Sequence, residues 1–208
     1  MIMIILEGYV FYMLVALVGI SIGYHRYFTH NSFKANSYIE ILMLFSGLIC
    51  GNRSVLTWAG VHRMHHAHSD TKKDPHSPTY LGIPSVLFST WSVTYMPGRY
   101  ITDLMKNPRV VFFHRYGNIM YAIYCISILL YGLTAFYIFV VSPFVMAWLG
   151  FGLLNYIAHK DGEAKDIPML NVIGLGEGWH KYHHAHPGAT SLNKYDIAGV
   201  LIEVIRTK

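Results

Sequence analysis

The sequence predicts an all-α integral membrane protein, with about three transmembrane helices and a histidine-rich helical cap. Apolar residues make up 53% of the 208 residues and charged residues only 13%, well below the roughly 25% usual in soluble domains. Long apolar segments alternate with polar ones, and thirteen histidines gather mainly in the polar segments. The length suits one domain, so we expect residues 1–208 to fold as a single unit.

The predicted spans are residues 2–23, 117–138 and 144–159. The first carries Glu7 as its only charge, has no basic segment or cleavage site beside it, and would be ~33 Å long as a helix, against a bilayer core of ~30 Å. The apolar block from 116 to 159 is too long for one crossing, and Ser142-Pro143 interrupts it, so we expect a turn there. Residues 38–50 are too short to cross and are expected in the interface or against the spans.

The basic residues predict the orientation. All 16 lysines and arginines lie within 24–115 or 160–208, so the positive-inside bias places both regions, and the cap they form, in the cytoplasm. We expect a bacterial inner membrane, a host membrane if the chain is viral, or the endoplasmic reticulum. The net charge of +5 is not gathered into a basic arm, which argues against nucleic-acid binding. Cys50 and Cys125 lie in apolar runs and are expected to be free thiols.

The histidines have the spacing of metal ligands. On an α-helix, positions i, i+3 and i+4 share a face, so each HxxHH cluster can direct three imidazoles to one place. Imidazole binds zinc, copper, iron and nickel, and nine clustered imidazoles exceed the needs of one ion, so we predict two metals. His68, His76, His114 and His186 lie outside the clusters and are expected at the surface or behind the ligands. The nine candidates are His25, His30, His62, His65, His66, His159, His180, His183 and His184.

The types of candidate ligand argue against two classes of metal site. The sequence has no HExxH motif of the zinc hydrolases and no clustered carboxylates like those of soluble di-iron bundles. Neutral nitrogen donors around two irons at a membrane surface would favour oxygen chemistry on a lipid chain.

These motifs resemble those of the membrane fatty acid desaturase family, in particular its acyl-CoA (stearoyl-CoA, delta-9 type) branch. The resemblance covers about residues 20–190 in the family's order, and the four-residue gap in the first box points to this branch. The matching strings are GYHRYFTHNSFKA from Gly23, WAGVHRMHH from Trp58, DPH from Asp74, NYIAH from Asn155 and GEGWHKYHH from Gly176.

The resemblance implies that residues 1–208 form one membrane desaturase domain in which the nine histidines bind two irons. Asn155 would act on one iron through a water, and Trp58 would line the acyl channel. The expected reaction uses O2 to introduce a cis double bond, expected at delta-9, into an acyl chain carried on CoA, a carrier or a lipid. Asp74 and Glu177 are candidate acceptors for ligand N–H groups, whereas Asp70 could equally be a solvated surface carboxylate.

Electrons are expected from a separate donor of the cytochrome b5 or ferredoxin type, because the chain shows no fused redox domain. A basic surface could dock this donor, an acyl-carrier phosphate or lipid headgroups. The residues of this surface are Lys72, Lys73, Arg99, Lys106 and Arg109.

Two alternatives stay open. A fatty acid or alkane hydroxylase shares histidine boxes, although the GEGWH and NxxxH strings argue against it. A non-catalytic membrane metal-binding protein is the other, because one span precedes the first box here, whereas family members typically have two.

Overall fold

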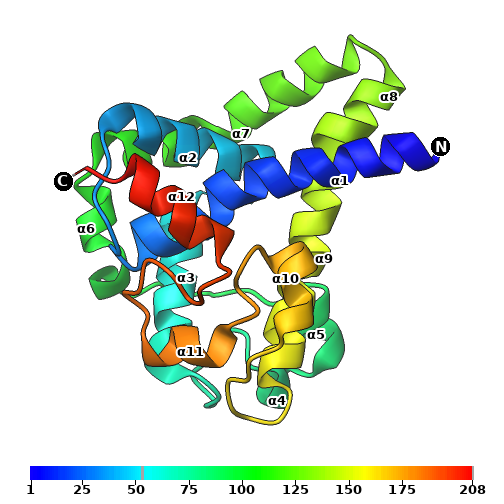
Figure 1. Ribbon diagram of the computed structural model, residues 1–208. Helices are drawn as coiled ribbons and strands as arrows, with labels where there is room; N and C mark the ends of the chain where they lie inside the picture. Colours follow the sequence, from blue (N-terminus) through cyan, green and yellow to red (C-terminus); the bar gives the residue numbers. More distant parts are fainter. Residues whose placement is uncertain (53, 208) are drawn as a thin grey trace.

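The computed structural model describes residues 1–52 and 54–207; Arg53 and Lys208, which the predicted cytoplasmic regions include, lie outside them. The described backbone is helical and contains no strand, which confirms the predicted all-α class (Figure 1). The elements are α1 (Ile2–Ala16), η1 (Leu17–Thr29), α2 (Ser37–Ile49), α3 (Val55–His68), α4 (Pro78–Leu81), α5 (Ile83–Leu87), η2 (Gly98–Tyr100), α6 (Thr102–Met105), α7 (Pro108–Leu129), α8 (Leu133–Phe136), η3 (Tyr137–Val141), α9 (Ser142–His159), η4 (Pro168–Leu170), α10 (Asn171–Gly174), α11 (His180–Ala185) and α12 (Ile197–Ile205).

In the part of the chain that the structure describes, two continuous helices are long and apolar enough to cross a membrane. One joins α1 and η1 over Ile2–Thr29, and the other joins α8, η3 and α9 over Leu133–His159. Only 22% and 44% of their apolar windows are buried within the protein, so much of their apolar surface faces outward. A core helix of a soluble protein would be mostly covered, so this exposure favours a lipid environment. The N-terminal end of α1 and the α7–α8 hairpin project from the same side of the molecule (Figure 1).

The structure corrects the predicted turn at Ser142-Pro143. The chain turns between α7 and α8, at residues 130–132, and the second long helix continues through Pro143. A proline cannot donate to the carbonyl four residues earlier. That carbonyl, of Phe139, instead accepts a hydrogen bond from Tyr124 on α7, with 2.6 Å between the oxygens, and the π-helical turn η3 ends at Val141, two residues before the proline. Residues 117–129 therefore lie on α7, and one helix takes in 133–138 together with 144–159, in place of the expected pair 117–138 and 144–159.

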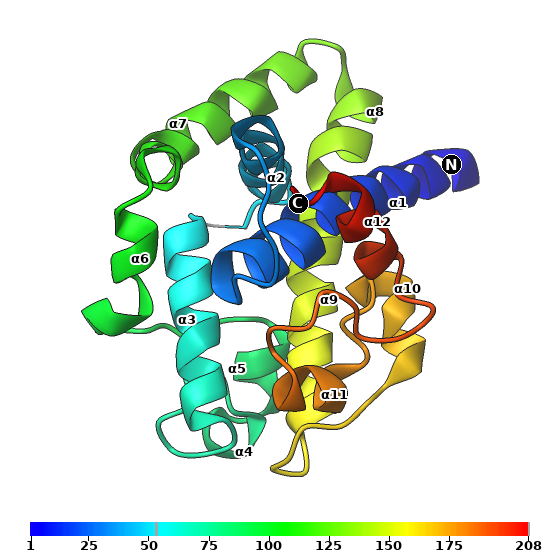
Figure 2. The same ribbon diagram turned by 60° about the vertical axis from the view of Figure 1, so that its left-hand side comes forward.

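The helix α2 packs closely along η1 (Figure 2). A Cβ on Gly19 would lie 2.2 Å from the backbone nitrogen of Gly47. The two helices can therefore approach this closely only because residue 19 is glycine. At 13 residues, α2 is the short apolar helix that the sequence predicts. The main apolar core lies between η1, α2, α3, α7 and α12, with Ile22, Met43 and Ile202 fully buried in it. This packing holds the last turns of η1 in place.

The polar end of the fold gathers segments that are far apart in the sequence. The C-terminal end of α3, the loop after it, the end of α9 and α11 lie together, away from the projecting helices (Figures 1 and 2). The final helix α12 then returns to pack against η1. Cys50 is buried, Cys125 is half-buried and both are free thiols, as predicted.

Candidate metal centre

The first histidine pair is aligned by a π-helical backbone. Residues five apart do not share a face of an α-helix, but η1 is π-helical over 13 residues, and its hydrogen bonds join residues five apart. One such bond runs from the N–H of His30 to the carbonyl oxygen of His25, at 3.2 Å, and the two ring centroids are 4.9 Å apart. The four-residue gap of the first box is therefore the spacing that this wider helix needs.

The other histidines come from three ordinary helical turns. His62, His65 and His66 lie on α3, His180 to His184 on α11, and His159 at the end of α9. Arg63 holds α3 against the end of η1, because its guanidinium donates to the carbonyls of Phe28 and Thr29 at 2.8 Å. Asp166 fixes α11 by accepting from the backbone N–H of Lys181 at 2.8 Å.

All nine predicted histidines converge, and they form two groups. The ligand atoms of each group of four lie within 4.8 Å of one another. His66 joins the first group, since its Nε2 lies 2.8 Å from that of His183 and 3.1 Å from that of His62. The first group is thus His25, His30, His62, His66 and His183, and the second is His65, His159, His180 and His184.

Each of the three predicted carboxylates lies against a different histidine. Asp74 contacts Nδ1 of His65 at 3.0 Å, and Asp70 contacts Nδ1 of His159 at 3.1 Å. Glu177 Oε2 lies 2.8 Å from Nδ1 of His25, although the alignment is poor for a hydrogen bond. A carboxylate accepts but does not donate, so the ring nitrogen that faces it, Nδ1, carries a proton. The Nε2 atoms then point toward the other histidines.

This arrangement fits bound metal ions. The Nε2 atoms of His159 and His180 approach to 2.9 Å, and those of His65 and His184 to 3.2 Å. In addition, Nε2 of His30 is buried and has no hydrogen-bond partner among the described residues. Converging lone pairs and an unpaired buried nitrogen are costly unless a cation lies between them. The site therefore has ring nitrogens with unpaired lone pairs, which metal ions would bind.

The electrostatics also favour metal binding. Burial, followed by repulsion from neighbouring imidazoles, lowers the pKa of His66 to about 2 and that of His184 to about 3. The same causes hold the pKa values of His62, His65, His180 and His183 well below their ordinary value. The rings are thus neutral at pH 7, which is the form that binds metals.

Glu177 stays ionised behind the first group. Burial raises the pKa of Glu177. The adjacent His25 and Arg26 and a hydrogen bond from Ser21 lower this pKa by more than burial raises it, so the pKa lies below its usual range. Sequence reasoning missed Arg26, which lies inside the first box, and Asp196, its other carboxylate partner. An arginine within an apolar helix was the only signal available for this contact.

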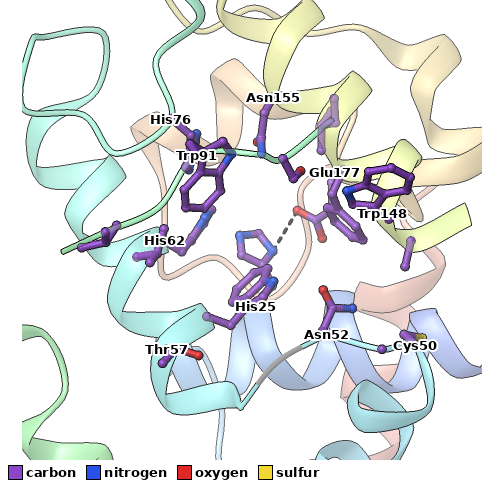
Figure 3. Close-up of a pocket in the computed structure, with 18 of the residues that line it drawn as sticks. His25, Cys50, Asn52, Thr57, His62, His76, Trp91, Trp148, Asn155 and Glu177 are labelled. Carbon is purple, nitrogen blue, oxygen red and sulfur yellow. Dashed lines mark ion pairs between the residues drawn. The ribbon is translucent and has the colours of Figure 1, made fainter. Parts of the chain in front are cut away.

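A cavity of about 470 Å³ opens beside the histidines. His25, His62 and His180 reach its wall, and Trp58 lines it with its ring stacked on His62 at 5.1 Å. Asn155, one turn before His159, also lines the cavity. Figure 3 shows Asn155 near Trp91 and His76 on one side of the cavity, and Asn52 and Cys50 on the opposite side. The ion pair of His25 and Glu177 lies between these two sides.

The remaining histidines differ from one another. His76, expected at the surface or behind the ligands, is 4% exposed and stacks on His65 with 4.2 Å between centroids. His114 and His186 are exposed, and His68 contacts Tyr100. Of the suggested docking residues, Lys72 and Lys73 are exposed, whereas Arg109 is engaged by the buried carboxylate of Glu40.

Comparisons with known proteins agree with this geometry. A family model described as fatty acid desaturase matches residues 6–193. An sn-1 stearoyl-lipid 9-desaturase of Anabaena variabilis is 29% identical over 182 residues, covering 81% of this chain and 66% of the relative. An acyl-CoA C20 Delta5-desaturase of Anemone leveillei is 32% identical, covering 84% and 60%, and stearoyl-CoA desaturase 4 of Mus musculus is 29% identical, covering 89% and 59%. The chain thus spans less than two thirds of the length of these relatives.

Proposed function

Because the chain belongs to the fatty acid desaturase family, we propose that it is a membrane-bound acyl desaturase whose two histidine groups hold two iron ions. The observation that carries the proposal is the convergence of nine imidazoles in two groups beside a cavity of about 470 Å³. Five histidines would hold one ion, and four, with a water held by Asn155, the other. When bound, the irons would supply the O2-dependent oxidation that removes two hydrogens from adjacent methylenes.

The cavity supports an acyl chain as the substrate. Its lining is mostly apolar, with Trp58, Trp148 and Phe151 among the larger side chains. Such walls bind methylenes without directional contacts and exclude water from the reacting carbons. Trp58 lies flat against His62, so a chain packed on the indole would pass close to the first histidine group. We propose delta-9 as the position of the double bond, because sn-1 stearoyl-lipid 9-desaturases are among the relatives of this chain.

The headgroup could be a lipid or CoA, since the relatives include a stearoyl-lipid and several acyl-CoA desaturases. We place Ile2–Thr29 and Leu133–His159 across the membrane, with the polar end in the cytoplasm where the basic residues lie. Electrons would come from a separate cytochrome b5-type or ferredoxin-type protein, for which the exposed Lys72 and Lys73 offer a docking point.

The test is expression of this chain in a host that lacks its own desaturase, followed by fatty-acid profiling of the membranes. We expect a new cis-monounsaturated product, and the double-bond position is read by fragmentation of the derivatised acyl chain. The matched control is His183→Ala, which should give no product at equal protein level. A hydroxylated product would indicate a hydroxylase instead, and no product from protein holding two irons would indicate a non-catalytic metal-binding protein.

A further inference from the structure

Arg26 is the largest fully buried side chain among the described residues, at 1% exposure. Its guanidinium lies between two carboxylates: one nitrogen is 2.9 Å from Oδ2 of Asp196, and another is 3.3 Å from Oε1 of Glu177. It also donates to the carbonyl of Thr190 at 3.3 Å. A buried guanidinium is tolerated only with such partners. Residues from the first helix, the third histidine segment and the C-terminal segment therefore meet at one charge cluster.

The two oxygens of Glu177 have separate partners. Oε1 receives Arg26 and also a hydrogen bond from Ser21, at 2.6 Å. Oε2 lies 2.8 Å from Nδ1 of His25. Because one oxygen is held from behind, the other is directed at the imidazole. The contacts form a chain that runs from Asp196 through Arg26 and Glu177 to His25.

Asp196 is itself rigidly placed. Its side chain accepts from the backbone N–H groups of Leu192 at 2.8 Å and Ala198 at 3.1 Å, and the second bond caps α12. The backbone beside it leaves no spare room. Gly176 has φ +103°, and a Cβ there would lie 2.7 Å from Oδ1 of Asp196 and 3.3 Å from Arg26. The residue preceding Glu177 is thus a glycine that lets the carboxylate and the guanidinium approach.

The cluster holds more carboxylates than guanidinium groups. Two carboxylates share one guanidinium among side chains that are at most 4% exposed. A cation held nearby would stabilise such a cluster. The open direction is through His25, whose Nε2 belongs to the first histidine group.

We propose that Asp196 is a positioning residue for the first histidine group, and that it raises the metal affinity of that group by fixing Glu177 against His25 through Arg26. Asp196 lies beyond residues 6–193, the range that the family model matches. The inference rests on the proposed function only in requiring that metal binds at the histidines. Groups that orient a ligand from behind typically change metal affinity 10–100-fold.

The test compares Asp196→Asn with the wild type, both purified in detergent and loaded anaerobically with ferrous iron, in a titration with a competing chelator. Asparagine keeps the size and the helix cap but removes the charge. We expect one of the two irons to be lost at about tenfold lower chelator concentration, while the other is retained as in the wild type. The matched control is Asp103→Asn, which removes a surface partner of Arg63 and should leave both affinities unchanged.

A second variant separates positioning from general stability. Breaking the buried pair leaves Arg26 partly unpaired, so Asp196→Asn lowers the stability of the whole protein. The double variant Arg26→Met with Asp196→Asn removes both the guanidinium and the Asp196 carboxylate and leaves Glu177 held from behind by Ser21 alone, and we still expect selective loss from one site. If the wild type holds two irons, equal weakening of both sites in the variants, or unchanged affinity at both sites, would overturn this inference alone. A wild-type protein that holds fewer than two irons would overturn the proposed function as well.

Discussion

The imidazole rings of His66 and His184 stack with their centroids 4.4 Å apart and their planes inclined by 20°. His66 belongs to the first histidine group and His184 to the second, so the two groups share a wall of stacked rings. Each ring also contacts a histidine of its own group through Nε2, His62 for His66 and His180 for His184. The two sites are therefore adjacent but built from separate donors.

This separation predicts that single ligand losses are selective. His183→Ala should remove the iron of the first group and His184→Ala that of the second, because each variant takes one donor from one site. Elemental analysis of the purified proteins should give about one iron per chain in either variant. Both should be inactive, since the proposed reaction uses both ions.

His114→Ala is the control for these variants, because that exposed histidine contacts only Ser54 among the described side chains and should leave two irons in place. Wild-type iron content in His183→Ala or His184→Ala would contradict the division into two groups.

Asp70→Asn is predicted to weaken the second site by about tenfold. The sequence left Asp70 equally open as a surface residue, but its carboxylate lies 3.1 Å from Nδ1 of His159 and its side chain is 12% exposed. The neutral amide no longer increases the basicity of the imidazole. A chelator titration measures the change, with Asp161→Asn, an exposed partner of Lys165, as control. An unchanged metal affinity would show that Asp70 is a surface carboxylate with no effect on the second site.

Tyr124→Phe should lower the free energy of unfolding by about 1 kcal/mol, because it leaves the carbonyl of Phe139 without this hydrogen bond. The cost should be smaller when Pro143 is replaced by alanine, whose N–H can bond the same carbonyl. A double-mutant cycle, measured by unfolding in mixed detergent, gives the coupling between the two positions. Additive effects would show that Tyr124 does not compensate for the proline.

The metal-free protein should lose stability as the pH falls from 7 to 5. Burial is the main cause that lowers the pKa of His76 from 6.5 to about 4 in the folded chain. Between these values the unfolded chain binds a proton that the folded chain does not, so acid favours unfolding. Each such group contributes a slope of about 1.4 kcal/mol per pH unit.

His76→Gln should make this slope shallower by about that amount, in unfolding curves recorded on protein stripped of metal. An identical pH dependence in wild type and variant would show that the pKa of His76 is the same in the folded and the unfolded chain.

Local features of the sequence were sufficient to predict the helical class, the apolar segments 2–23 and 144–159 of the two long helices, and the candidate histidines. Helical periodicity depends only on neighbours along the chain, so the HxxHH strings already place three rings on one face. The same local reasoning misplaced the turn at Ser142-Pro143, because the compensating donor Tyr124 comes from another helix.

Only the tertiary structure decided how the histidines divide into two groups and which carboxylate lies behind each one. His66 and His183 are 117 residues apart, and Arg26 and Asp196 are brought together only when α12 packs on η1. Such contacts depend on helix packing, which no local pattern encodes. The sequence alone therefore gave the candidate donors, and the packing of η1, α3, α9 and α11 determined how those side chains are arranged.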